Sequence, residues 1–178
     1  MLQAGPYQGL WRKLVLRFKE AGDAALAEVL VDYLATLSQT HLPVPDRVAA
    51  VPTSRRGWRW RGYGAPEQLA RGLAIRLNCP QVQGFACPGD PRPQKRLNFS
   101  QRRHSPLRFE CTAPVQGSIL LVDDVVTSGA TLAAARQALL RAGAREVWPV
   151  VLAGARSGEP SRRREASRKA RRATNSAR

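Results

Sequence analysis

Apolar residues recur along the first forty positions at the spacing of amphipathic helices. In the stretch 7–20 they fall three or four positions apart, which predicts a helix. A second apolar stripe follows Asp23, whose carboxylate suits the N-cap of a helix. The two prolines of the stretch 41–46 end that second helix. We therefore expect residues 1–40 to form a helical N-terminal part.

Beyond residue 46 the pattern changes to short apolar runs that alternate with helical stripes. The runs predict strands at 47–52, 81–86, 118–124 and 146–155, and the stripes predict helices at 65–77 and 130–144. Strands that alternate with helices form βαβ units. We therefore predict an α/β fold with a mostly parallel central sheet and helices on both faces.

Composition indicates an ordinary globular chain. Its 178 residues suffice for one domain, and 43% hydrophobic with 24% charged residues is typical of soluble proteins. No apolar run approaches the roughly 20 residues that span a bilayer, and basic residues interrupt the early apolar positions where a secretory signal would lie. Only three cysteines occur. We expect a cytoplasmic protein with no membrane partner.

The formal net charge is +16, and it is unevenly distributed. Residues 161–178 hold eight Lys or Arg against one Glu, which leaves +9 for residues 1–160. This tail has no apolar periodicity, so we expect it to be disordered. It is either an arm that binds nucleic acid or a solvated extension without a partner. The remaining +9 favours an anionic substrate.

The stretch 120–131, LLVDDVVTSGAT, joins an apolar run to two acids and a loop of small residues. Ligands of open α/β sheets bind beyond the carboxyl ends of the strands, and we expect Asp123 and Asp124 at such an end. The loop enters a predicted helix, whose unpaired N–H groups and dipole attract phosphate, and Gly129 lets the backbone close around it. Carboxylates accept hydrogen bonds from a vicinal diol or hold Mg²⁺ through water. The pattern predicts a ligand such as a ribose 5-phosphate with a metal.

Part of this pattern also occurs in three different settings. A Walker B strand has a similar apolar run and acids, but the sequence holds no G-x-x-x-x-G-K-[ST] motif. Phospho-acceptor domains also carry paired acids, normally from their first strand. A strand that merely ends in solvated acids is the plainest alternative, and it would not require the TSGAT loop.

The stretch 119–131, ILLVDDVVTSGAT, resembles the PRPP (phosphoribosyl pyrophosphate) signature of type I phosphoribosyltransferases. The wider chain is similar to the ComF/GntX branch of that superfamily in the stretches 5–23, 51–70, 94–109 and 115–147. The resemblance covers most of residues 5–153. It implies a type I phosphoribosyltransferase fold over residues 1–160, PRPP as substrate, Mg²⁺ as cofactor and a link to DNA uptake in natural competence.

The resemblance also implies roles for individual residues. Asp123 and Asp124 would be catalytic residues that bind the ribose hydroxyls and, indirectly, Mg²⁺. The 5-phosphate would meet Thr127, Ser128, Gly129, Ala130 and Thr131. The diphosphate would meet Ser54, Arg55 and Arg56, because guanidinium groups suit phosphate oxygens.

A long basic loop would close over this site and shield the reaction from water. Its implied members are Lys95, Arg96 and the catalytic residue Arg102. For this loop and for the arginines near residue 55, a solvated or merely mobile basic segment stays open as the alternative.

The sequence departs from the family pattern in several places. Many members begin with a four-cysteine zinc module that this sequence lacks, so either the gene start is placed too late or this version has no module. Members read RGFNQ where residues 61–65 read RGYGA, and they carry an Asn near Ser105. Both changes fall on the acceptor side. Thr127 stands where 6-oxopurine enzymes have an Asp, which argues against purine salvage.

Two classes of function fit these features. One is an enzyme that transfers phosphoribosyl to an unknown acceptor and releases pyrophosphate. The other is a non-catalytic PRPP sensor or a nucleic-acid-binding competence protein. Trp58, Trp60 and Tyr63 lie among arginines, where they either stack on bases or pack the loop against the domain. The expected partners are PRPP and single-stranded DNA or another nucleic acid, through the basic loop and tail; a homodimer is left open.

Overall fold

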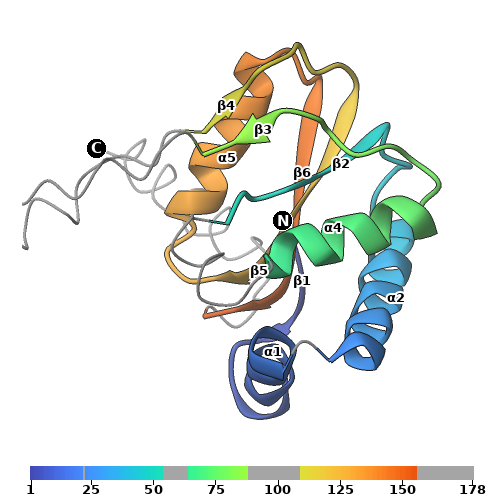
Figure 1. The fold of residues 1–178 in the computed structure, drawn as a ribbon, viewed down its shortest axis with the longest axis vertical. Helices are drawn as coiled ribbons and strands as arrows, with labels where there is room; N and C mark the ends of the chain where they lie inside the picture. Colours follow the sequence, from blue (N-terminus) through green and yellow to red (C-terminus); the bar gives the residue numbers. More distant parts are fainter. Residues whose placement is uncertain (22, 54–63, 88–108, 156–178) are drawn as a thin grey trace, which may run out of the picture.

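The computed structural model describes residues 1–21, 23–53, 64–87 and 109–155. Figure 1 shows its elements in chain order, which are β1 (Leu2–Pro6), α1 (Gly9–Ala21), α2 (Ala24–His41), β2 (Arg47–Ala50), α4 (Ala65–Arg76), β3 (Phe85–Ala86), β4 (Glu110–Cys111), β5 (Ser118–Val126), α5 (Ala130–Arg141) and β6 (Glu146–Gly154). The tail 161–178 and most of the two basic segments lie outside the described residues.

The main sheet has four parallel strands in the order β1-β6-β5-β2. Its central strands β5 and β6 are nine residues long; β5 is buried along almost its whole length and β6 from Val150 to its end. Strands buried on both faces read as continuous apolar runs, and ILLV and VVLA are such runs. The parallel sheet predicted from the sequence is confirmed.

Helices cover both faces of this sheet (Figure 1). Leu120 and Val122 of β5 pack with α1, α2 and α4, whereas Ile119 and Leu121 pack with α5 on the other face. This alternation follows from the period of two along a strand. Among the described residues, no helix is long and apolar enough to cross a membrane.

Strand β1 departs from the expected helical N-terminal part. It pairs in parallel with β6, starting with Leu2 opposite Val150. Its sequence, LQAGP, contains a glycine and ends in a proline, so it carries little strand signal. It lies at the edge of the sheet, where strands tolerate proline. The expectation of a purely helical N-terminus is therefore wrong for residues 2–6.

The two N-terminal helices form close to their predicted bounds. Asp23 is the N-cap of α2, and its Oδ1 accepts a hydrogen bond of 3.0 Å from the backbone N–H of Leu26. Phe18 is fully buried, but Leu10 on the same predicted stripe is 70% exposed. The stripe therefore packs against the core through Trp11, Val15 and Phe18, while Leu10 lies outside this contact.

A small second sheet lies beside the main one. Of the predicted strand 81–86, only Phe85 and Ala86 form a strand, β3, which pairs antiparallel with β4. Gln81 makes a single bridge to Val48 of β2. The chain between β3 and β4 holds the predicted basic loop, so the strand pair brings both ends of that segment together.

Candidate functional site

The two acids lie inside strand β5 rather than at its end. The strand continues through Val125 and Val126, so the prediction that the acids mark the mouth of the strand is wrong by two residues. Asp123 is 9% exposed and Asp124 is 8% exposed. Both carboxyl groups are therefore largely withdrawn from water, although they remain near the carboxyl edge of the sheet.

Backbone amides and a lysine hold the carboxylates in place. Asp123 Oδ1 accepts a hydrogen bond of 2.8 Å from the N–H of Asp124, and Asp124 Oδ1 accepts one of 2.6 Å from Val125. Asp124 Oδ2 forms an ion pair of 2.8 Å with the Nζ of Lys19, in helix α1. Three of the four carboxylate oxygens thus have a partner of known geometry.

The environment of Asp123 changes its protonation. Burial disfavours its charged form, and the adjacent carboxylate of Asp124 repels a second negative charge, so the pKa of Asp123 rises from 3.8 to about 7. Near neutral pH the Asp123 carboxyl is therefore about half protonated. A ligand that brings positive charge or donates hydrogen bonds favours the fully ionised pair.

The loop after β5 turns sharply into helix α5. Gly129 is the N-cap of α5, and its φ of 80° lies in the left-handed region that glycine adopts at little cost. Thr127 and Ser128 are exposed, and Thr131 is partly exposed. The first turn of α5 contains no acidic residue. An exposed helix N-terminus with nearby hydroxyl groups and no acid suits a phosphate.

The structure thus joins the predicted acids to the predicted phosphate loop. Asp123 and Asp124 lie near the C-terminal end of β5, and after Val126 the residues Thr127, Ser128 and Gly129 lead into Ala130 and Thr131 at the start of α5. The other predicted site residues lie outside the described part of the chain, and they are Ser54, Arg55, Arg56, Lys95, Arg96 and Arg102. Their proposed roles stay predictions.

One end of the first basic segment is firmly held. Glu67, in the first turn of α4, accepts hydrogen bonds of 2.7 Å from both the N–H and the hydroxyl of Thr53. Gly64 leaves room for this carboxylate, because a side chain there would collide with it. Thr53 and Gly64, which flank the segment 54–63, therefore both lie against the carboxylate of Glu67.

Sequence reasoning did not find Lys19 or Glu67 as site residues. Lys19 lies in an amphipathic helix and Glu67 in another, and charged residues are ordinary there. For Glu67 the sequence offers one indication of its position, because acids are common in the first turn of a helix. No pattern in the sequence connects Lys19 with Asp124.

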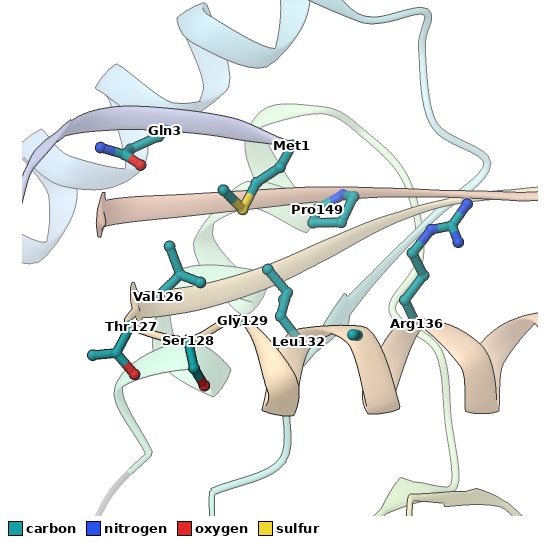
Figure 2. A pocket seen from close by; sticks show the side chains of 10 residues that line it. Met1, Gln3, Val126, Thr127, Ser128, Gly129, Leu132, Arg136 and Pro149 are labelled. Carbon is teal, nitrogen blue, oxygen red and sulfur yellow. The ribbon is translucent and has the colours of Figure 1, made fainter. Parts of the chain in front are cut away.

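A cavity of about 280 Å³ lies on the β1 side of the phosphate loop. Figure 2 shows Met1, Pro149 and Leu132 around it, while Thr127 and Ser128 point away from Met1 and Pro149. Neither Asp123 nor Asp124 lines this cavity. The cavity therefore shares Thr127, Ser128 and Gly129 with the phosphate loop but does not include the acid pair.

The residues present fit a hard cation such as Mg²⁺ only in part. Carboxylate oxygens are its preferred protein ligands. Among the described residues, however, no group of three or more His, Cys, Asp or Glu side chains could hold a metal ion. Two carboxylates leave most of an octahedral shell to water or to substrate oxygens. The prediction of a metal bound through water stays a prediction.

The chain is similar in sequence to a known domain family and to two named bacterial proteins. The phosphoribosyl transferase domain matches residues 113–173, which include the acids and the phosphate loop. "DNA utilization protein YhgH" of Salmonella typhi is 40% identical over 132 residues, or 70% of this chain and 58% of that protein. The Escherichia coli K12 protein of the same name is 33% identical over 138 residues, or 74% of this chain and 60% of that protein. The chain thus spans about three fifths of these relatives.

Solved structures share the architecture. The glutamine PRPP amidotransferase of B. subtilis, complexed with ADP and GMP, matches 77% of this chain and 30% of its own. The TM-score is 0.53 at 18% sequence identity. A likeness at this identity concerns the fold alone.

Proposed function

Because this chain belongs to the ComF type of the phosphoribosyltransferase family and has the α/β fold of its type I members, we propose that it binds PRPP at the acid pair and phosphate loop. One observation carries the proposal. The buried acids Asp123 and Asp124 lead directly into an exposed, glycine-capped helix N-terminus without acids of its own. The proposed site for a ribose diol therefore lies next to the proposed site for a phosphate. The diol and the phosphate are likewise close together in a ribose 5-phosphate.

Each part of this site has a distinct task in the proposal. Asp123 and Asp124 accept hydrogen bonds from the ribose hydroxyls. The N–H groups and hydroxyls of residues 127–131 bind the 5-phosphate. When bound, Mg²⁺ neutralises the diphosphate, and these carboxylates hold it through water or substrate oxygens. Arginines fit the remaining diphosphate oxygens, which is the role proposed for Arg55 and Arg56.

We extend the proposal to transfer of the phosphoribosyl group. A nucleophile forms a bond to ribose C1 while the bond from C1 to the pyrophosphate oxygen breaks. The protein contributes mainly position and charge stabilisation to such a step. Arg102 is proposed to act when the basic loop closes. The acceptor is left unnamed.

Calorimetry with Mg²⁺ and PRPP tests the binding proposal. The double variant Asp123→Asn, Asp124→Asn keeps the size of both side chains but removes their charge. We expect it to lose Mg²⁺-dependent PRPP binding while its unfolding transition stays cooperative. Asp32→Asn, an exposed acid on α2, is the matched control and should bind as the wild type does. Undiminished affinity in the double variant would refute the proposal.

A second candidate function is a binding protein that uses PRPP as a signal in DNA use. It is favoured by the name of the relatives, "DNA utilization protein", and by the net charge of +16. A pyrophosphate-release assay with bases, amines and single-stranded DNA separates the two functions. In an enzyme, Arg102→Ala lowers turnover more than PRPP affinity, whereas Arg55→Ala weakens binding itself. A sensor binds PRPP and releases no pyrophosphate with any acceptor.

A further inference from the structure

Lys19 reaches the acid pair from a part of the chain that the motif does not include. It lies near the C-terminal end of α1, and its Nζ is 2.8 Å from Asp124 Oδ2. The side chain of Lys19 is 23% exposed and that of Asp124 is 11% exposed. By contrast, Arg17 on the same helix is 69% exposed in its pair with Asp23. The Lys19 pair is thus shielded from water, where charges interact more strongly.

The ammonium group contacts one of the two carboxylate oxygens that accept no backbone N–H in the hydrogen bonds described above. Asp123 Oδ1 and Asp124 Oδ1 each accept a backbone N–H, so these atoms are already engaged. Asp124 Oδ2, the second oxygen of that carboxylate, is the one that Lys19 contacts. A cation that approaches Asp124 therefore meets a positive charge already in place.

We propose that Lys19 is the resident counter-ion of the acid pair, which a divalent metal has to displace from Asp124. The proposal rests on the proposed function only in taking the acids as the metal-facing groups. A lysine ammonium suits this task because it is a compact charge on a flexible stem that can move aside. Asp124 is thus neutralised in the ligand-free protein, and the metal gains little by binding alone.

This arrangement has a consequence for the order of binding. A metal that arrives alone exchanges one cation for another at Asp124 and keeps most of its water. A metal that arrives on an anionic ligand such as PRPP brings phosphate oxygens as further ligands. The ligand's negative charge also accepts the displaced ammonium. Lys19 therefore favours the metal–ligand complex over the bare metal.

The test measures binding of Mn²⁺ alone, as a paramagnetic probe for Mg²⁺, by electron paramagnetic resonance. Lys19→Gln removes the competing charge and should tighten Mn²⁺ binding roughly tenfold. Lys19→Arg keeps the charge and should bind as weakly as the wild type. Lys13→Gln removes the same charge from an exposed position on α1 and should change little. Unchanged or weaker Mn²⁺ binding in Lys19→Gln, or an equal gain in Lys13→Gln, would overturn the proposal.

A measurement on the wild-type protein covers the case in which Lys19→Gln does not fold. Brief acetylation with acetic anhydride, read by mass spectrometry, reports how accessible each lysine amine is. Saturating Mg²⁺ should raise the labelling of Lys19 several-fold relative to Lys13. If the ratio stays constant, Lys19 only fixes α1 to the sheet and the proposal fails. Neither experiment contains PRPP, so a protein that passes them and still binds no PRPP contradicts the proposed function alone.

Discussion

Asp123 is an ordinary carboxylic acid whose place in a central strand changes its behaviour. The folded protein holds its proton more tightly than the unfolded chain does, because its pKa is about 7 when folded against 3.8 as a free side chain. Between these values the folded state carries more protons than the unfolded state. The free energy of unfolding therefore falls as pH rises from about 4 to about 7 through this group.

Asp123→Asn should remove this fall in the free energy of unfolding with rising pH. Asparagine does not ionise, and its Oδ1 can still accept the Asp124 N–H. The difference in free energy of unfolding, variant minus wild type, should therefore increase by roughly 2–4 kcal/mol as pH rises from about 4 to about 8. Urea denaturation across that range measures the difference. A difference that does not change with pH would show that Asp123 is fully ionised, or fully solvated, in the folded protein.

Among single residues, the sequence predicts the groups that are neighbours along the chain. Asp123, Asp124 and the loop 127–131 are contiguous, so one motif indicates them together. Lys19 joins them only because β1 and β6 place α1 beside the end of β5. The tie between Glu67 and Thr53 depends in the same way on how α4 packs. Such contacts depend on tertiary structure, which local spacing does not contain.

Among the structural elements, the turn from β5 into α5 depends on Gly129. A methyl group there would find space, because the nearest atom is Val126 Cγ2 at 3.7 Å, but the φ of 80° disfavours any side chain. Gly129→Ala should therefore cost about 1–2 kcal/mol of stability. It should also weaken Mg²⁺-dependent PRPP binding, since the N–H groups of the loop turn away from the phosphate. Denaturation and calorimetry on the same samples measure both effects.

Gly9 offers a matched control for this prediction. Its φ of 52° is also left-handed, an added Cβ would meet nothing within 4 Å, and it begins helix α1, outside the loop 127–131. Gly9→Ala should lose a similar amount of stability and keep PRPP affinity. If both variants lost affinity equally, the effect of Gly129→Ala would be one of general stability.

Whole elements are predictable where their patterns are long and self-contained. The helices α2 and α4 and the strands β5 and β6 follow from periodicity, caps and apolar runs. The sequence pattern does not predict strand β1, because its five residues end in Gly-Pro and form a strand only through pairing with β6. The helical stripe predicts a buried Leu10, but Leu10 is exposed, whereas Trp11 of the same turn packs against the core and the ring of Tyr33.

For the molecule as a whole, the charge is the feature that the fold does not explain. The tail 161–178 carries seven of the sixteen net positive charges. Deleting it should weaken nonspecific binding of single-stranded DNA and flatten the dependence of log K on log salt, by about 0.7 for each phosphate that the tail neutralises. A tail of equal length with glutamine at its eight basic positions should behave like the deletion. An unchanged slope would show that the tail contacts no phosphate.

The proposed site requires that one ligand joins the acid pair to the phosphate loop. A crystal structure with PRPP and Mn²⁺, with the metal located by its anomalous signal, tests this requirement most directly. We expect ribose hydroxyls within hydrogen-bonding distance of Asp123 and Asp124, and the 5-phosphate at the N-terminus of α5. We also expect Lys19 to have left Asp124. PRPP bound elsewhere, or no bound ligand at saturating concentration, would contradict the proposed site.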